Sequence, residues 1–355
     1  MFAKHRNEAN PLGRNYALCF RGRLSEELEE TDANVFDVGP VRLSRPWSVW
    51  AARRRLKKHM QKFDVVVCHA MWSHMVFGPA IRKEGKPLVI WAHDAPVDLH
   101  WIDRIGMRVR PDLVIANSYY TKELWRLNFP KVPCQVGYYP LPEPDHAEPS
   151  KVRERVRIET ETDNQTTVIL IAARFESWKG HELLFNAISN FKERDDWVCW
   201  VAGGVQRDSE RYMVAKLKEI ARQNGISDRI RWLGSRSDVF DLMLAADIYC
   251  QPNLAPEPFG VAFIEAMHAR LAIVSANTGG PKEFLDDSCG ILIEQSDLEH
   301  LIQSLLCLLN DPLRRLRLGA AAKDRVEKMF SLETNIANLK RIFTKVRDGF
   351  RKKPQ

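Results

Sequence analysis

The sequence predicts an α/β protein built from two doubly wound parallel sheets, on three observations. Short apolar runs alternate with helix-like segments along almost the whole chain, which is typical of parallel strands covered on both faces. The length of 355 residues exceeds what one hydrophobic core usually serves, so two domains are expected. A stretch with prolines at 140, 142, 144 and 149, followed by polar residues, separates the two alternating halves.

The first half is predicted to form a sheet whose strands end in polar residues. A helix over 22–30, a strand over 35–38 and a basic helix over 47–60 come first. Four strands are then expected at 63–69, 87–94, 112–118 and 134–138. The first three end in His69, in His93 and Asp94, and in Asn117 and Ser118. Ligands bind outside the carboxyl ends of such strands, so we expect this edge to face a cleft.

The second half repeats the alternation. Its strands are expected at 166–174, 197–204, 230–234, 247–252 and 271–276. Its helices are expected at 181–190, 208–224, 237–245, 260–270 and 281–285, and two amphipathic helices follow Pro312. The predicted domains are therefore 1–145 and 165–331, with a linker over 146–164.

Composition limits the class of protein. The chain is 45% hydrophobic and 28% charged, as in ordinary globular proteins. Its seven cysteines are scattered and form no C-x-x-C pair, which indicates reduced thiols in a cytoplasmic protein and no zinc site. No apolar run approaches the roughly 20 residues of a membrane span, and no signal peptide opens the chain.

The net charge of +7 lies mainly in the first part of the chain, where 22 Lys and Arg stand against 17 Asp and Glu up to residue 150. The helix over 47–60 combines Trp47 and Trp50 with five Arg and Lys residues, and the basic segment extends to 62. We expect these tryptophans to pack on the sheet; the alternative is a peripheral contact with an anionic membrane at its inner surface. No aromatic–basic recognition motif is present, so nucleic acid is not an expected partner.

Two carboxylates, Glu257 and Glu265, flank Gly260 in the stretch P-N-L-A-P-E-P-F-G-V-A-F-I-E, residues 252–265. The flanking prolines hold Glu257 in a loop, because proline disfavours helix in the residue before it. Glu265 lies one to two turns inside the helix that begins after Gly260. A helix N-terminus that begins with a glycine is a potential anion-binding site, and the two carboxylates can accept hydrogen bonds from hydroxyl groups.

Arg174 and Lys179 lie five residues apart in A-R-F-E-S-W-K-G-H, where the first strand of the second half turns into a helix. Two cations at the carboxyl edge of a sheet suit a diphosphate, although charged surface loops are common. The pairs Gly203-Gly204 and Gly279-Gly280 follow other strands, where the backbone could approach a ligand. No G-x-G-x-x-G or P-loop occurs, which argues against a dinucleotide dehydrogenase and an ATPase.

These two motifs, with W-L-G-S between them and N-T-G-G-P-K-E after them, resemble the donor-binding domain of family 4 glycosyltransferases, retaining enzymes with the GT-B fold. The resemblance is close over 165–340 and looser over 60–140. It implies two Rossmann-like domains facing a cleft, with a C-terminal helix over 332–350 returning to the first domain. It also implies transfer of a hexosyl or N-acetylhexosamine group from a nucleoside diphosphate sugar to a hydroxyl of a glycan or lipid-linked acceptor, in polysaccharide, glycolipid or cell-surface glycan synthesis. An Arg–Lys pair can neutralise the departing diphosphate and no Asp-x-Asp is present, so no metal is expected.

The resemblance also implies roles for single residues. Arg174 and Lys179 would contact the donor diphosphate, and Glu257 would bind hydroxyls of the transferred sugar. The backbone of Phe259 and Gly260 would lie near that sugar. Two further residues complete the implied site: Glu265 at the nucleotide ribose, and His93 near the reacting carbon.

The first residues depart from the family pattern, which opens with an apolar strand and a glycine-rich loop. We expect no such strand before Arg21, since N-P-L-G-R-N has one glycine and no apolar run precedes it. This departure leaves open a non-catalytic nucleotide-sugar-binding or degenerate partner subunit. An epimerase on the same fold is a further alternative.

Overall fold

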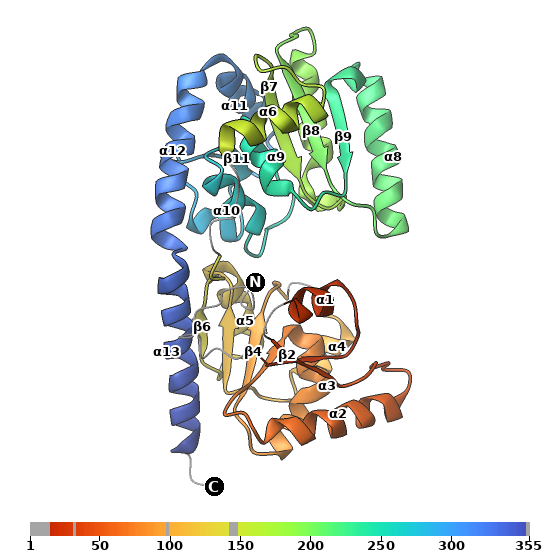
Figure 1. The fold of residues 1–355 in the computed structure, drawn as a ribbon, viewed down its shortest axis with the longest axis vertical. Coiled ribbons are helices and arrows are strands. Elements are labelled where there is room, and N and C mark those ends of the chain that lie inside the picture. The colour runs from red at the N-terminus through yellow and green to blue at the C-terminus, as the bar shows by residue number, and fades with distance from the viewer. Residues whose placement is uncertain (1–14, 31–32, 97–98, 142–147, 353–355) are drawn as a thin grey trace. The chain divides into compact units, whose positions relative to one another are not determined.

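The computed structural model describes residues 15–30, 33–96, 99–141 and 148–352, which divide into two compact units. Unit 1 comprises residues 1–141 and 330–355, and unit 2 comprises 142–329. Both units are α/β, and Figure 1 labels their helices and strands and colours them in chain order.

Unit 1 contains a parallel sheet in the order β3-β4-β5-β6 and a separate parallel pair, β1-β2. Its strands are β1 Asn15–Leu18, β2 Asn34–Asp37, β3 Val66–His69, β4 Leu88–Ala92, β5 Leu113–Ala116 and β6 Cys134–Val136. Its helices are α1 Arg23–Glu29, α2 Pro46–Met60, α3 Ala70–Lys83, α4 Trp101–Gly106, α5 Tyr119–Asn128 and α13 Leu332–Arg351. The strands β4 and β5 are buried along their whole length, as their continuous apolar runs predict.

The C-terminal helix α13 packs on unit 1, as expected. Leu339 and Ile342 join the apolar cluster formed by Val89, Leu113 and Ile115 of the sheet. Figure 1 shows α13 beside β6. Gly137, which follows β6, makes this contact possible, because a Cβ there would lie 2.9 Å from a methyl carbon of Leu339.

The expectation that no strand precedes Arg21 was wrong, because β1 pairs in parallel with β2 from Asn15 to Leu18. Its four residues, N-Y-A-L, alternate between exposed and half-buried positions. A run of four residues that mixes polar and apolar side chains is too short to show a strand periodicity. The loop after β1 carries one glycine, Gly22, at the start of α1. The earlier part of the N-P-L-G-R-N segment lies outside the described residues.

Unit 2 is a six-stranded parallel sheet in the order β12-β11-β10-β7-β8-β9. Its strands are β7 Thr167–Ala172, β8 Trp197–Ala202, β9 Ile230–Gly234, β10 Ile248–Gln251, β11 Ala272–Ala276 and β12 Ile291–Ile293. Its α-helices are α6 Pro149–Glu159, α7 His181–Ile188, α8 Asp208–Gln223, α9 Val239–Ala245, α10 Val261–His268, α11 Leu298–Asn310 and α12 Pro312–Met329. Four short 3₁₀ turns are η1 Ser177–Lys179, η2 Ser189–Phe191, η3 Ser227–Arg229 and η4 Gly280–Glu283.

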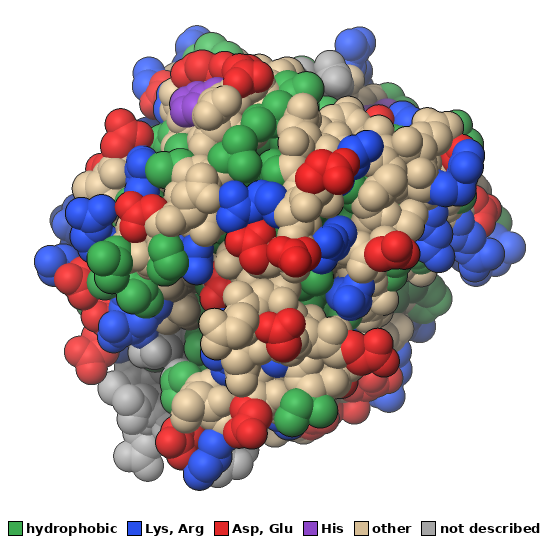
Figure 2. All heavy atoms as spheres, turned by 90° about the horizontal axis from the view of Figure 1, so that it is seen from above, with side chains coloured by type: hydrophobic (Ala, Val, Ile, Leu, Met, Phe, Trp, Pro, Cys, Tyr) green, Lys and Arg blue, Asp and Glu red, His purple; other side chains and the backbone are tan. Residues whose placement is uncertain are grey.

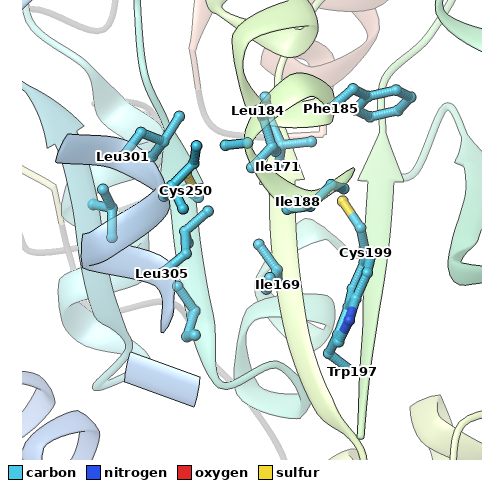
Figure 3. Close-up of a cluster of buried hydrophobic side chains, with 14 of the residues drawn as sticks. Ile169, Ile171, Leu184, Phe185, Ile188, Trp197, Cys199, Cys250, Leu301 and Leu305 are labelled. Atoms are coloured by element: carbon cyan, nitrogen blue, oxygen red, sulfur yellow. The ribbon is translucent and has the colours of Figure 1, made fainter. Parts of the chain in front are cut away.

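The largest core cluster of unit 2 lies between the sheet and helices α7, α8 and α11. Figure 3 shows part of it, with Ile169 and Ile171 of β7 facing side chains from β8, α7 and α11. Cys199 and Cys250 are buried in this cluster, and all seven cysteines are free, as their scattered spacing predicts. Neither β12 nor α11 was predicted from the sequence, although the leucine spacing in α11 is typical of a helix.

The stretch 146–164, expected to be a linker, contains a helix that packs on unit 2. Helix α6 buries Val152, Val156 and Arg157 and lies against α9. Its sequence is hydrophilic and rich in Arg and Glu, and its apolar stripe consists of only two valines, so the sequence pattern did not indicate a packed helix. The helix expected at 281–285 is instead the 3₁₀ turn η4, because Pro281 stands at its start and Gly280 packs against Phe259.

Helix α2 forms as predicted, but its tryptophans do not pack on the sheet. Trp47 is 66% exposed and Trp50 is 62% exposed, whereas Ala52, Leu56 and Met60 form the buried face. The guanidinium of Arg54 lies over the Trp50 ring, 5.4 Å from its centroid. The prediction that these tryptophans pack on the sheet was therefore wrong, because periodicity alone could not show which face of the helix the sheet covers.

Candidate functional site

The carboxyl edge of the unit 2 sheet brings two of the predicted donor-site residues, Lys179 and Glu257, together at its centre. From the centre of the sheet, β7, β8 and β9 follow one another toward one edge, and β10, β11 and β12 follow one another toward the other edge. The order of the strands therefore reverses between β7 and β10, which is where open α/β sheets bind ligands. Lys179 follows β7 in the chain and Glu257 follows β10.

The loops after β7 and β10 are joined through their backbones. Gly180, with φ +81°, ends η1 and begins α7, and a Cβ there would lie 2.0 Å from the carbonyl oxygen of Pro252. The Leu254 N–H donates to the carbonyl of Trp178 at 2.7 Å. Only glycine combines this left-handed conformation with so close an approach. The chain therefore holds Lys179 next to the loop that carries Glu257.

Lys179 and Glu257 form an ion pair at the point where the two loops meet. Lys179 Nζ lies 2.5 Å from Glu257 Oε2, and their side chains are only 12% and 13% exposed. The ammonium group also lies 4.0 Å from the centroid of the Trp178 ring. The motifs predict that these two residues bind one ligand, but the contact between their side chains was not predicted from the sequence.

Buried amides of β10 and its loop fix the Glu257 carboxylate. Glu257 Oε2 accepts from Asn253 Nδ2 at 3.2 Å and from Gln251 Nε2 at 3.4 Å. The Gln251 side-chain oxygen in turn accepts from the Tyr249 hydroxyl at 2.6 Å. Burial and the nearby carboxylates raise the pKa of Tyr249 well above its usual value, so this hydroxyl remains a donor. Sequence reasoning missed these three residues, although Gln251 ends β10 and Asn253 follows two residues later, at a strand end where polar side chains are expected to matter.

Gly279 and Gly280 support the Glu257 loop. Gly279, with φ +72°, bridges to Glu257, and a Cβ there would lie 2.3 Å from the Glu257 carbonyl oxygen. The Gly280 N–H donates to that same oxygen at 2.7 Å. The Glu257 loop occupies the space that a Cβ would fill at both glycines, so their lack of a side chain permits this packing.

Phe259 and Gly260 lead into α10. The Phe259 side chain is 3% exposed and packs edge-on to Phe284, with ring centroids 6.0 Å apart, so only its backbone is available to a ligand. Gly260, with φ +91°, is the first cap residue of α10. Glu265, half-buried in the second turn, accepts no side-chain hydrogen bond from the described residues, and burial raises its pKa.

Arg174 is not part of the Lys179–Glu257 pair. Its guanidinium forms an ion pair with Glu176 at 2.7 Å, and its side chain is 53% exposed. His181, at the start of α7, is 2% exposed, and neither of its ring nitrogens has a partner among the described residues. Burial, and then the charge of Lys179, lower the pKa of His181 to about 4.

His93 lies at the carboxyl edge of the unit 1 sheet. Its Nε2 lies 2.8 Å from His69 Nδ1, and its Nδ1 lies 2.6 Å from the Tyr139 hydroxyl. Asn117 Nδ2 donates to the same hydroxyl at 3.1 Å. His69, His93 and Asn117, predicted at the first three strand ends, thus meet in one network, whereas Ser118 caps α5 by accepting from the Thr121 N–H. Tyr139, which follows β6, also belongs to this network; it was not predicted from the sequence.

Two family models match the chain. The model described as "Glycosyl transferases group 1" matches residues 152–325, and the model "Glycosyltransferase Family 4" matches residues 15–138. In the part of the chain that the structure describes, no group of three or more His, Cys, Asp or Glu residues could hold a metal ion.

Named relatives include a human alpha-1,3/1,6-mannosyltransferase, ALG2, which is 25% identical over 81% of this chain and 74% of its own length. A GDP-mannose-dependent phosphatidylinositol monomannoside mannosyltransferase of Corynebacterium glutamicum is 28% identical over 47% of this chain. The chain spans only 44% of the length of that bacterial relative.

Solved structures show the same fold. The Anabaena protein Alr3699/HepE in complex with UDP superposes with a TM-score of 0.82 at 20% identity, covering 93% of this chain and 91% of that one. WaaG, a glycosyltransferase of lipopolysaccharide biosynthesis, superposes with a TM-score of 0.67 at 16% identity, covering 91% and 98%. The chain has the GT-B fold, with two Rossmann-like units.

Proposed function

Because this chain belongs to family 4 of the glycosyltransferases, we propose that it transfers a sugar from a nucleoside diphosphate sugar to an acceptor hydroxyl with retention of configuration. The product would be a polysaccharide, a glycolipid or another cell-surface glycan. The Corynebacterium relative is named for GDP-mannose and a lipid-linked acceptor, and the Anabaena structure holds UDP; both names support a nucleotide-sugar donor. The observation that carries the proposal is the Lys179–Glu257 pair between the loops of β7 and β10.

This pair offers one cation and one strong acceptor at the same place. Without ligand each group neutralises the other, and their low exposure makes this pairing stronger than it would be in water. A donor diphosphate would draw the Lys179 ammonium to itself, and a hydroxyl of the transferred sugar would then donate to the freed oxygen of Glu257. The same ligand thus replaces both halves of the ion pair.

The remaining contacts extend from this pair. Arg174 would leave Glu176 for the diphosphate, and the Phe259 and Gly260 backbone would face the sugar. Glu265 would accept from the nucleotide ribose, because its half-buried carboxylate has no side-chain partner among the described residues. Lys179 and Arg174 would neutralise the departing diphosphate, so we propose that no metal is required. His93, in unit 1, would act near the reacting carbon.

An assay with a panel of UDP-, GDP- and ADP-sugars tests the function. We expect one of them to release its nucleoside diphosphate in the presence of glycosylated lipid or oligosaccharide acceptors, equally with and without EDTA. The anomeric configuration of the product, measured by NMR, checks retention. Tight nucleotide binding without any release of diphosphate from the panel would instead favour a degenerate binding subunit.

We also propose that helix α2 places unit 1 on an anionic membrane surface. No described helix is both long and apolar enough to span a bilayer, so any membrane contact of these helices would be peripheral. Trp47 and Trp50 are exposed on a helix whose last turn carries Lys57 and Lys58. Amphipathic aromatic rings and basic side chains are the two components of binding to anionic lipid.

Replacing both Trp47 and Trp50 by alanine is expected to weaken partitioning onto vesicles containing phosphatidylserine by about tenfold or more, since two large apolar side chains are lost from the interface. Co-sedimentation measures the change. Trp101→Ala removes a tryptophan of similar exposure, 51%, from α4 and serves as the control. Equal losses in both variants, or none in the double variant, would contradict the membrane contact.

A further inference from the structure

A pocket of about 910 Å³ lies at the amino-terminal edge of the unit 1 sheet. Three segments form its wall: the end of α3 with Arg82, the connection into β5 with Asp112, and the connection into β6 with Lys131. His93 follows β4 at the carboxyl edge, which is the opposite end of these parallel strands. The pocket is therefore separate from the residues proposed to act on the sugar.

The lining of this pocket is strongly basic. Arg82, Arg108, Arg110 and Lys131 contribute four positive charges, and Asp112 is the only acidic residue among the described residues that line it, which leaves an excess of three positive charges. Three prolines and a valine complete the lining. The face of the molecule drawn in Figure 2, by contrast, mixes acidic and basic side chains, as ordinary protein surfaces do. One sign of charge in a concave site attracts a ligand of the opposite sign.

Two of the four cations are held in place by main-chain and carboxylate oxygens. Arg82 Nε donates to the Arg110 carbonyl at 3.0 Å, and Arg82 Nη1 donates to Asp112 Oδ2 at 2.7 Å. Arg110 in turn donates to the Lys131 carbonyl. The Asp112 carboxylate is anchored on the sheet, because it also accepts from the Leu88 N–H at 2.9 Å. A guanidinium has five N–H donors and these contacts use only part of them, so both arginines can also donate to a ligand.

The main chain between Arg108 and Arg110 is fixed from inside the unit. His74 of α3 is fully buried, and its Nε2 lies 2.7 Å from the Val109 carbonyl. A carbonyl can only accept, so Nε2 carries the hydrogen and donates it. Pro111, which is buried, follows Arg110 directly and has a fixed φ. The backbone that carries both arginines is thus restrained on the side away from the pocket.

Arg108 and Lys131 are the two remaining cations of the pocket. Both are exposed, and the side chain of neither forms an ion pair or a hydrogen bond with any residue that the structure describes. They come from different connections, one before β5 and one before β6, yet they line the same pocket. A ligand would therefore meet two guanidinium groups already in position and two mobile cations able to close on it.

We propose that this pocket is a second anion-binding site, for an organic ligand with a terminal phosphate group. The planar fork of arginine matches two oxygens of a phosphate, and lysine adds a point charge. A terminal phosphate carries about two negative charges at pH 7, which suits the excess of three positive charges. The pocket volume is that of a small-molecule site, so there is room for the organic part of the ligand. This site goes beyond the proposed sugar transfer and does not depend on it.

Arg108→Gln combined with Lys131→Gln tests the site, because these side chains have no contacts within the described residues to lose. Inorganic pyrophosphate is the soluble probe, measured by isothermal titration calorimetry. The proposed donor site would also take a diphosphate, so the titrations are made in Lys179→Ala. We expect the double substitution to weaken pyrophosphate binding about tenfold or more and to leave the thermal unfolding midpoint unchanged.

A second arm presents the phosphate on a lipid. Phosphatidylcholine vesicles with phosphatidic acid expose a terminal phosphate, whereas vesicles with phosphatidylserine expose only a phosphodiester. For a lipid headgroup, we expect the double substitution at Arg108 and Lys131 to lower co-sedimentation with phosphatidic acid vesicles about tenfold, and to change binding to phosphatidylserine vesicles less. Lys192→Gln combined with Lys345→Gln removes two other exposed lysines and is the control for net charge.

A loss with either probe that is absent from the control supports the site, and the probe affected identifies the source of the phosphate. A loss with both supports a terminal phosphate from either source. Equal losses in the pocket and control variants, or no loss with either probe, would overturn the proposal. Neither arm requires turnover, so the pocket and the transferase function fail separately.

Discussion

Lys179→Ala is expected to abolish sugar transfer while leaving the fold intact. Lys179 supplies a positive charge, largely shielded from water, between the loops of β7 and β10. Charge stabilisation of this kind acts where negative charge develops on the leaving diphosphate, and removing one such group typically costs about 3–4 kcal/mol, or roughly 10²–10³ in kcat. Single-turnover rates with the preferred nucleotide sugar measure the loss.

The fold should survive this change because Glu257 keeps its other partners. Asn253 and Gln251 still donate to its carboxylate, and the Gly279–Gly280 backbone still holds its loop. We expect a stability loss of about 1–3 kcal/mol for the missing charged hydrogen bond.

Lys216→Ala is the matched control for Lys179→Ala. Lys216 also pairs with a glutamate of unit 2, Glu182, at 2.6 Å, but on the surface, with side-chain exposures of 45% and 30%. It should leave turnover unchanged. Wild-type turnover in Lys179→Ala would remove the main support for the donor site.

Arg157→Met is expected to give the largest loss of stability, about 3–5 kcal/mol for unit 2. Arg157 is 1% exposed and donates to the carbonyls of Asp163, Thr166 and Ala245. It also pairs with Asp247 at 2.7 Å. Methionine fills similar space but leaves a carboxylate and three carbonyls without this donor.

The loss of stability in Arg157→Met is expected to extend to the sheet, because the Asp247 carboxylate also accepts from the Val168 N–H of β7 at 2.7 Å. Urea unfolding gives the free-energy change, and amide hydrogen exchange in β7 and β10 locates it. Arg153→Met is the matched control: Arg153 bonds the same carboxylate at 2.8 Å and is 32% exposed. It should lose about 1 kcal/mol. Equal losses in the two variants would contradict the role given to burial.

The positions of the predicted donor-site residues relative to the helices and strands of unit 2 follow from local signals in the sequence. Arg174 and Lys179 follow β7, Glu257 follows β10 and Glu265 lies inside α10, and the apolar runs give the boundaries of these elements. The pairing of Lys179 with Glu257 was not predictable, since these residues lie 78 positions apart and meet only when β10 pairs beside β7. The buried support from Tyr249 and Gln251 depends on the same register.

The sequence by itself determined the doubly wound architecture of both units, because alternating apolar runs and helical segments allow few other arrangements. It also determined which strand ends carry polar chemistry. The tertiary structure decided what those groups do to one another. It placed Glu257 beside Lys179, buried Arg157 of α6 in unit 2, and joined His93 through its two ring nitrogens to His69 and Tyr139. Such relations depend on strand register and on which side chain occupies the space between elements, and neither is encoded in a local pattern.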